Sequence, residues 1–279
     1  DEIWQKADVQ IEGDRTAQKL IRLHIFHTFS TCSPHNADLD AGIPARGLHG
    51  EAYRGHIFWD DMYVLPLIDL HYPKAARSAL MYRYNRLPGA REYARKHGYQ
   101  GAMFPWQSGR NGGEETQTLH LNPLSGEWGA DYSTLQRHVS LSVAVNVWEY
   151  LWINDDQDFL ENFGAELFLE ICRFWASKAT FNQKSGLYDI AQVMGPDEFH
   201  EKYPDATEGG LKNNSYTNIL VAWSLKRAFD LLEKMGAKAK TTLLEKMRLD
   251  DGELARWQDI SQKLTVPLND EGVLEQFEG

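Results

Sequence analysis

The chain has 279 residues, enough for one large domain or two small ones with a substantial buried core. Its 40 acidic and 29 basic side chains give a net charge of -11, which disfavours general binding to nucleic acids and anionic membranes. Aromatic residues make up 12% of the chain and include nine Trp, so the composition favours a neutral ligand with flat apolar faces, such as a sugar.

Hydrophobic periodicity predicts a mostly helical chain. Apolar residues recur at steps of three or four, and Asp156 is suited to cap the second helix of a hairpin formed by 133–152 and 158–179. In chain order, we expect helices at 16–28, 57–71, 75–97 with an interruption at Pro88 and Gly89, 133–152, 158–179, 218–234 and 253–264. Strand-like alternation is scarce and is clearest at 188–194. The fold class predicted from these patterns is all-α.

Three long polar connections, 30–56, 98–132 and 180–217, separate the predicted helices. Loops of this length in a compact domain are usually functional or disordered. Their content of Trp, His and carboxylates argues against disorder. We therefore expect the functional site to be built from these loops.

The third loop contains a rigid acidic motif, Gly-Pro-Asp-Glu-Phe-His-Glu at 195–201. Pro196 fixes its own φ and restricts Gly195, so the carboxylates that follow are held in one direction, as a proton donor requires. The alternative is a solvated acidic surface loop. The flanking aromatic residues Phe199, Tyr188 and Tyr203 favour a site.

Trp59 and Asp60 follow the first loop and open the helix predicted at 57–71. An indole next to a carboxylate can stack on a sugar ring and accept hydrogen bonds from its hydroxyls. On local grounds it is equally plausible that Asp60 caps the helix while Trp59 fills the core. The second loop offers a weaker signal of the same kind, in which Trp106 is followed by Glu114 and Glu115.

Other chemistries find less support in the sequence. His49, His56, His120, His138 and His200 occur among carboxylates, but none shows the spacing of a zinc protease, and we expect no metal. A Gly-x-Ser-x-Gly elbow and a nucleotide-binding glycine loop are both absent from the sequence. Cys32 and Cys172 are expected to be buried thiols in a reducing compartment.

Five ordered motifs together resemble the central catalytic region of glycoside hydrolase family 65, which contains maltose, trehalose and kojibiose phosphorylases and related hydrolases. They are Gly-Leu-His-Gly-Glu-Ala-Tyr-Arg-Gly-His-Ile-Phe-Trp-Asp at 47–60, Phe-Pro-Trp-Gln-Ser at 104–108, Arg-Phe-Trp-Ala-Ser at 173–177, Met-Gly-Pro-Asp-Glu-Phe-His-Glu at 194–201 and Asn-Asn-Ser-Tyr-Thr-Asn at 213–218. The likeness runs from about residue 33 to residue 279. It implies an (α/α)6 barrel, the toroid of six helical hairpins, and inverting cleavage of an α-glucosidic bond in a disaccharide.

The resemblance also implies roles for individual residues. Glu198, in the family's Gly-Pro-Asp-Glu motif, would be the general acid, and Trp59 and Asp60 would hold the glucosyl unit. Arg54, Trp106 and Asn214 lie in matching motifs and would be pocket residues. Asp61 departs from the small hydroxyl residue expected there, a change that could alter substrate choice.

The resemblance leaves the attacking group open. The family's Lys-Gln pair and Ser-containing phosphate loop have no counterpart here, so we expect residues 1–279 to form a single α/α-barrel catalytic domain that is part of a longer protein. Phosphate as co-substrate would need no base, whereas water would need a second carboxylate. Either route requires a protonated Glu198, whose pKa must be raised by roughly two units.

Two rival functions remain at this point. The first is a sugar-binding or regulatory domain that keeps the glucose pocket without catalysis. The second is another (α/α)-barrel activity, sugar epimerisation or uronate lysis. No apolar run reaches the roughly 20 residues of a membrane helix, so we expect a cytoplasmic protein without a membrane partner. In all cases we also expect a small-molecule ligand, no cofactor, no nucleic-acid partner and the capacity to form a homodimer.

Overall fold

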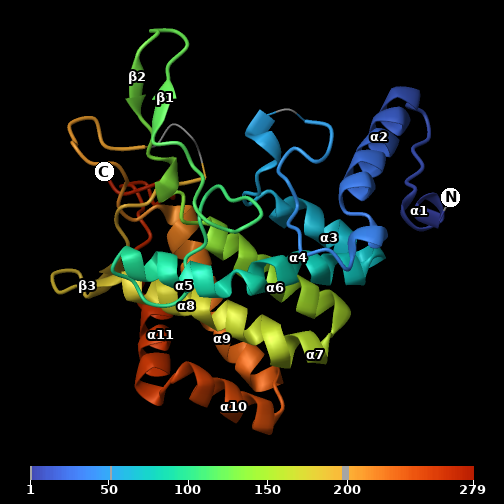
Figure 1. Cartoon of the computed structure of the whole chain (residues 1–279). Helices are drawn as coiled ribbons and strands as arrows, with labels where there is room; N and C mark the ends of the chain where they lie inside the picture. Colours follow the sequence, from blue (N-terminus) through green and yellow to red (C-terminus); the bar gives the residue numbers. More distant parts are fainter. Residues whose placement is uncertain (1, 51, 197–200) are drawn as a thin grey trace.

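The computed structural model describes residues 2–50, 52–196 and 201–279, and helices dominate it (Figure 1). The longer helices and single helical turns are α1 (Glu2–Ala7), α2 (Arg15–Thr31), η1 (Pro34–Asn36), η2 (Ala52–Gly55), α3 (Asp61–His71), α4 (Pro73–Asn85), α5 (Leu87–Lys96), η3 (Ser133–Leu135), α6 (Val139–Asn154), α7 (Gln157–Phe159), η4 (Leu160–Gly164), α8 (Ala165–Lys178), α9 (Ser215–Lys234), α10 (Ala237–Met247) and α11 (Asp251–Lys263). The prediction of an all-α chain is therefore confirmed.

The strands among the described residues form two short antiparallel hairpins. One pairs β1 (Leu119–Leu121) with β2 (Trp128–Ala130), and the other pairs β3 (Thr180–Asn182) with β4 (Leu187–Asp189). The strand expected at 188–194 is thus limited to β4, and the β1–β2 hairpin was not predicted. Strands of three residues are too short for an alternating pattern to be recognised.

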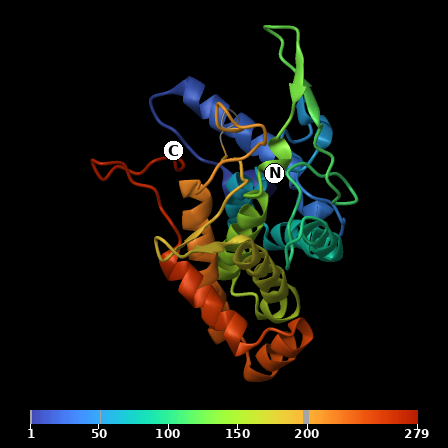
Figure 2. The ribbon, with the colours of Figure 1, turned by 90° about the vertical axis from the view of Figure 1, so that its left-hand side faces the viewer.

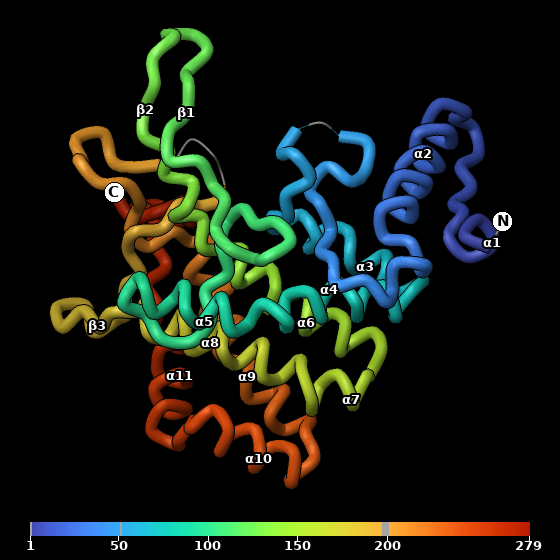
Figure 3. The backbone as a smooth tube through the Cα atoms, in the orientation of Figure 1, coloured from blue at the N-terminus to red at the C-terminus, as the bar shows by residue number. Residues whose placement is uncertain are grey.

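Layers of helices form the core and carry the loops on one side. The helix α3 packs against α6, α6 also contacts α4, α8 and α9, and α9 contacts α8 and α11. Large side chains such as Phe168, Trp175 and Trp257 are fully buried between these helices. Figure 2 and Figure 3 show that the β1–β2 hairpin lies on one side of the layers, whereas α10 lies on the opposite side.

Most predicted helices are present with shifted ends. The expected break near Pro88 divides 75–97 into α4 and α5, and Pro88 lies in the first turn of α5, where the lack of an N–H has no cost. Asp156 is the N-cap of α7, as predicted for the second helix of the hairpin, because its side chain accepts a hydrogen bond from the N–H of Phe159. The 57–71 helix begins only at Asp61, since Ile57 pairs with Ser108 instead of entering the helix. The helix predicted at 133–152 begins only at Val139, as α6, and the turn η3 precedes it.

Some helical elements were not predicted from the sequence. The helices α1 and α10, of six and eleven residues, were not predicted. The helix predicted at 158–179 ends at Lys178 and contains the π-turn η4 between α7 and α8. Cys32 and Cys172 are buried free thiols, as expected. In the part of the chain that the structure describes, none of the helices is long and apolar enough to cross a membrane.

Asp69 of α3 is a buried carboxyl group with a raised pKa. It is 1% exposed, and neither oxygen has a hydrogen-bond partner among the described residues. Burial, and then the charge of Glu149, raise its pKa to about 7. Because a carboxyl in the unfolded chain titrates near pH ~4, the folded protein holds the extra proton above that pH and loses stability as pH rises towards 7.

We expect Asp69→Asn, which has no charge to bury, to remove this loss. At about pH 8 the variant should be more stable than the wild type by about 1–3 kcal/mol, and its Tm should vary less between about pH 5 and 8. Thermal unfolding of both proteins across this range tests the prediction. Parallel pH profiles would show that Asp69 does not titrate in this window.

Candidate active site

A cavity of about 770 Å³ opens on the loop side of the helices. All three long loops contribute to its wall. The lining residues are Ala45, Tyr53, Arg54, Phe58, Trp59, Asp60, Trp106, Gln107, Thr116, Gln117, His120, Asn122, Pro123, Asp131, Ser133, Gln136, Pro196 and Glu201. Four predicted sugar-binding residues, Arg54, Trp59, Asp60 and Trp106, are therefore brought together here.

A short backbone pairing joins the first two loops. The N–H of Ile57 donates to the carbonyl of Ser108 at 2.8 Å, and the N–H of Ser108 donates to the carbonyl of Ile57 at 3.0 Å. The rings of Phe58 and Trp106 then meet edge to face, with centroids 5.1 Å apart. This pairing carries Trp59 and Trp106, which are 47 positions apart in sequence, to the same cavity.

Arg54 reaches the cavity from a strained turn. Tyr53 and Arg54 have φ values of 61° and 51°, in the left-handed region that side chains with a Cβ disfavour. Such strain persists where the surrounding structure holds it, and it is common at functional sites. The nearby bond between His56 Nε2 and Glu115, at 2.6 Å, fastens this loop to the second one.

Trp59 is half-buried and supported on several sides. Its indole meets the rings of His138, Tyr63 and Tyr216 edge to face, at centroid distances of 4.7, 5.4 and 6.0 Å. Trp59 therefore both packs against the core and lines the cavity. A ring held in this way is pre-organised for stacking on a ligand.

Asp60 stands at the cap position of α3, but its side chain makes no capping hydrogen bond in the described structure. The interpretation of Asp60 as a helix cap is therefore wrong. Burial, and then the charge of Asp61, raise the pKa of Asp60. A carboxylate that lines a cavity without a capping partner is available to a ligand.

Asp61 points elsewhere and has a structural role. It is 6% exposed, and its oxygens contact Arg83 Nη2 at 3.0 Å and Asn146 Nδ2 at 3.1 Å. Arg83 also donates to the carbonyl of Phe58 at 2.6 Å. Asp61 thus ties α3 to α4 and α6 beneath the cavity and is not one of its lining residues.

Glu114 holds the second loop in place through hydrogen bonds. Its carboxylate accepts hydrogen bonds from the backbone N–H groups of Trp106 at 3.1 Å and Gln107 at 3.3 Å. It also accepts from the hydroxyl of Tyr93 at 2.9 Å. The carboxylate expected beside Trp106 therefore holds the backbone that carries this indole.

Glu198, predicted as the general acid, lies in the segment 197–200, outside the described residues. The residues on either side of that segment, Pro196 and Glu201, both line the cavity. The chain therefore leaves and re-enters the described structure at the cavity wall. Burial raises the pKa of Glu201.

Asn214 is buried at the N-terminus of α9, 1% exposed and not among the lining residues. Its Oδ1 accepts from the backbone N–H of Thr217 at 3.0 Å, which caps the helix, and its Nδ2 donates to the carbonyl of Gln276 at 3.3 Å. A Cβ at Gly195 would lie 2.6 Å from Asn214 Nδ2, so a larger residue at 195 would force the Asn214 side chain to shift. Asn214 thus packs closely against Gly195 and caps α9.

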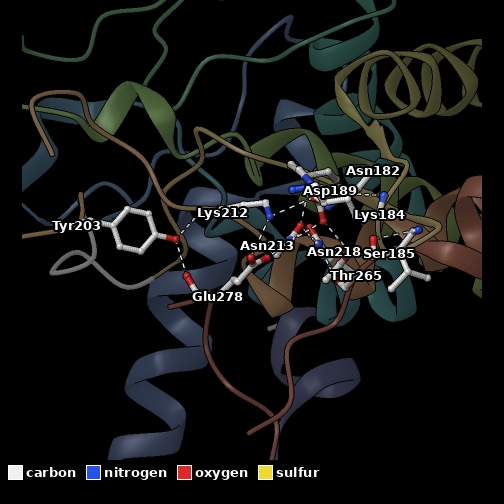
Figure 4. A network of polar contacts seen from close by, with 12 residues as sticks. Asn182, Lys184, Ser185, Asp189, Tyr203, Lys212, Asn213, Asn218, Thr265 and Glu278 are labelled. Carbon is white, nitrogen blue, oxygen red and sulfur yellow. Dashed lines mark hydrogen bonds and ion pairs between the residues drawn. The ribbon is translucent and has the colours of Figure 1, made fainter.

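A polar network anchors the same region to the end of the chain (Figure 4). Asp189 accepts hydrogen bonds from Asn213 Nδ2 and Thr265 Oγ1, both at 2.8 Å, and Lys212 Nζ lies 3.1 Å from it. Although burial acts to raise it, these bonds lower the pKa of Asp189 to about 2. Glu278 contacts Lys212 at 2.9 Å. These contacts tie the residues just before α9 to β4 and to the segment 265–278.

Several lining residues were not identified as site residues from the sequence. Asp131 accepts hydrogen bonds from Gln117 Nε2 at 2.9 Å and from the N–H of Ser133 at 2.8 Å, and the Nδ1 atom of His120 lies 3.9 Å away. His120 was considered only as a metal ligand. No group of three His, Cys, Asp or Glu suited to a metal ion occurs among the described residues. Only the unpredicted β1–β2 hairpin brings these side chains to the cavity.

Comparison with known proteins agrees with the motifs. Residues 22–279 match the model of the glycosyl hydrolase family 65 central catalytic domain. The chain is 47% identical to an uncharacterised glycosyl hydrolase of Mycobacterium tuberculosis, 42% identical to trehalose 6-phosphate phosphorylase of Lactococcus lactis and 39% identical to kojibiose phosphorylase of Caldanaerobacter subterraneus. These alignments cover 99%, 99% and 100% of this chain but only 21%, 35% and 36% of the relatives.

A solved structure shows the same architecture. A human-microbiome protein assigned as a kojibiose phosphorylase superposes with a TM-score of 0.83 at 29% identity, over 100% of this chain and 36% of that one. The predicted all-α, (α/α)6-barrel class is confirmed by this match. The chain spans between about a fifth and about a third of the length of these relatives.

Proposed function

The chain belongs to glycosyl hydrolase family 65, and on that premise we propose that the protein containing it cleaves an α-glucosidic bond, by phosphorolysis or hydrolysis, in a disaccharide. One observation carries the proposal: Trp59, Asp60 and Trp106 line a single cavity that also meets both ends of the segment containing Glu198. An aromatic face, a hydroxyl acceptor and a proton donor are the groups that such a cleavage requires.

The mechanism proposed here is inverting. Trp59 would stack on the glucosyl ring and Asp60 would accept hydrogen bonds from its hydroxyls, while Arg54 and Trp106 complete the wall. Glu198 would protonate the leaving oxygen as the nucleophile attacks the opposite face through an oxocarbenium-like state. Asp60 and Glu201 line the cavity, and their negative charges would favour the protonated form of a Glu198 that faces it.

Phosphorolysis is the better supported of the two routes. The relatives from Lactococcus lactis, Caldanaerobacter subterraneus and Bacillus selenitireducens are all named as phosphorylases. Inorganic phosphate would then be a co-substrate, and no other cofactor is required. We further propose a cytoplasmic protein without nucleic-acid or membrane partners, which can form a homodimer, and in which residues 1–279 belong to one catalytic domain.

Product analysis tests the proposal. The complete protein is incubated with maltose, trehalose, kojibiose and trehalose 6-phosphate, with and without inorganic phosphate. Glucose 1-phosphate formed only with phosphate is the expected result, and free glucose in both conditions would identify a hydrolase. Unchanged substrate throughout would favour a sugar-binding domain, whereas isomerised or unsaturated sugars would indicate an epimerase or a lyase.

A further inference from the structure

His138, at the start of α6, is a buried imidazole enclosed by aromatic residues of the cavity. It is 1% exposed. Its ring centroid lies 4.7 Å from that of Trp59, 5.2 Å from Trp106 and 6.1 Å from Tyr216. His138 is therefore in contact with both indoles of the candidate glucosyl site.

Among the described residues, the polar atoms of this ring make no well-formed hydrogen bond. Within the described structure, neither Nδ1 nor Nε2 of His138 has a hydrogen-bond partner. Burying a polar group without a partner costs stability, and a phenyl ring would pack in the same place without that cost. An unsatisfied buried group beside a functional cavity calls for an explanation in terms of function.

The backbone at Met194 supplies a polar group close to the ring. Burial lowers the pKa of His138 to about 3, and the backbone of Met194 acts in the opposite direction, as a nearby carbonyl oxygen does. The imidazole is therefore neutral at physiological pH, with one N–H to donate. Hydrogen bonds that are misaligned in a free enzyme often tighten when substrate binds.

Met194 is also well placed along the chain. It precedes Gly195 and Pro196, which lead into the segment that contains Glu198. Its N–H donates to the carbonyl of Leu135 at 2.9 Å, just before His138 in sequence. One imidazole thus lies between the sugar-stacking indoles and the backbone that leads to the proton donor.

We propose that His138 is a positioning residue, which holds the indoles of Trp59 and Trp106 and donates its N–H to the Met194 carbonyl when substrate is bound. In this way it aligns the glucosyl ring with Glu198. The inference rests on the proposed function. A packing role alone would need only the ring, whereas a positioning role also needs the N–H.

Two substitutions separate these roles in the complete protein. His138→Phe keeps an aromatic ring and removes the donor, and His138→Gln keeps a donor and removes the ring. We expect H138F to retain or raise the Tm and to lower kcat by about tenfold to a hundredfold with little change in KM, because misalignment of the reacting groups can cost this much. H138Q should melt at a lower temperature yet keep more of the wild-type kcat than H138F.

The pH profile gives an independent readout. Because His138 stays neutral, the limbs of the kcat profile should stay at the same pH in wild type, H138F and H138Q. Full kcat in a stable H138F would overturn the proposal, as would a kcat that follows Tm across the variants. If H138F fails to fold, His138→Leu and His138→Gln, which are similar in volume, repeat the comparison, and equal kcat values in this pair would overturn it. Inactivity of the wild type would instead reject the proposed function.

Discussion

Glu198→Gln is expected to lower kcat for a disaccharide by about 10²- to 10⁴-fold, the contribution typical of a general acid. The sugar leaving group is a poor one, and the amide cannot protonate it. Glutamine has nearly the same size and shape as glutamate, so substrate binding and therefore KM should change little. Steady-state kinetics of the complete protein on its best disaccharide measures both constants.

A substrate with a good leaving group provides the decisive control. Fluoride departs from α-glucosyl fluoride without protonation, so E198Q should retain most of its activity on this compound. Loss of activity on both substrates would indicate a misfolded or misassembled site. Full activity on the disaccharide would reject Glu198 as the acid.

Glu201→Gln is the matched variant, because Glu201 also lines the cavity and also has a raised pKa. If Glu198 is the acid, E201Q should keep a substantial kcat. It should also move the alkaline limb of the kcat/KM profile to lower pH, because the loss of a neighbouring negative charge lowers the pKa of Glu198. An inactive E201Q beside an active E198Q would transfer the role to Glu201.

The site illustrates which features a sequence reveals locally. Trp59, Asp60 and Trp106 could be selected because each indole has polar neighbours in sequence, in or directly beside a long loop. Their meeting in one cavity could not be deduced from periodicity, since it depends on a two-residue pairing of Ile57 with Ser108. The helices were predicted well for a similar reason: their apolar repeat is written in the segment itself.

Features that depend on tertiary contacts were not predictable in this way. The β1–β2 hairpin has no alternating signature, yet it brings His120 and Asp131 to the cavity. Asn214 was chosen for its motif, and only the structure reveals the cap it provides and its close approach to Gly195. His138 was considered only as a metal ligand, because it occurs among carboxylates. Its neighbours in sequence do not predict the two indoles that contact it.

The adjacent carboxylates Asp60 and Asp61 allow function and stability to be separated by single substitutions. Asp60→Asn should reduce kcat/KM by about 10²- to 10³-fold, because a charged acceptor for substrate hydroxyls becomes a neutral amide. Its Tm should be unchanged or higher, since burial raises the pKa of Asp60 and the amide carries no charge to bury.

Asp61→Asn should have the opposite effect. It leaves Arg83, whose side chain is 3% exposed, as a buried cation without its carboxylate, at a cost of about 3 kcal/mol or more. The folded fraction should retain most of its kcat, because Asp61 does not line the cavity. Thermal unfolding and kinetics on both variants test the pair. A destabilised D60N together with a stable, inactive D61N would reverse the two roles, and the glucosyl site would then have to be placed on the other side of α3.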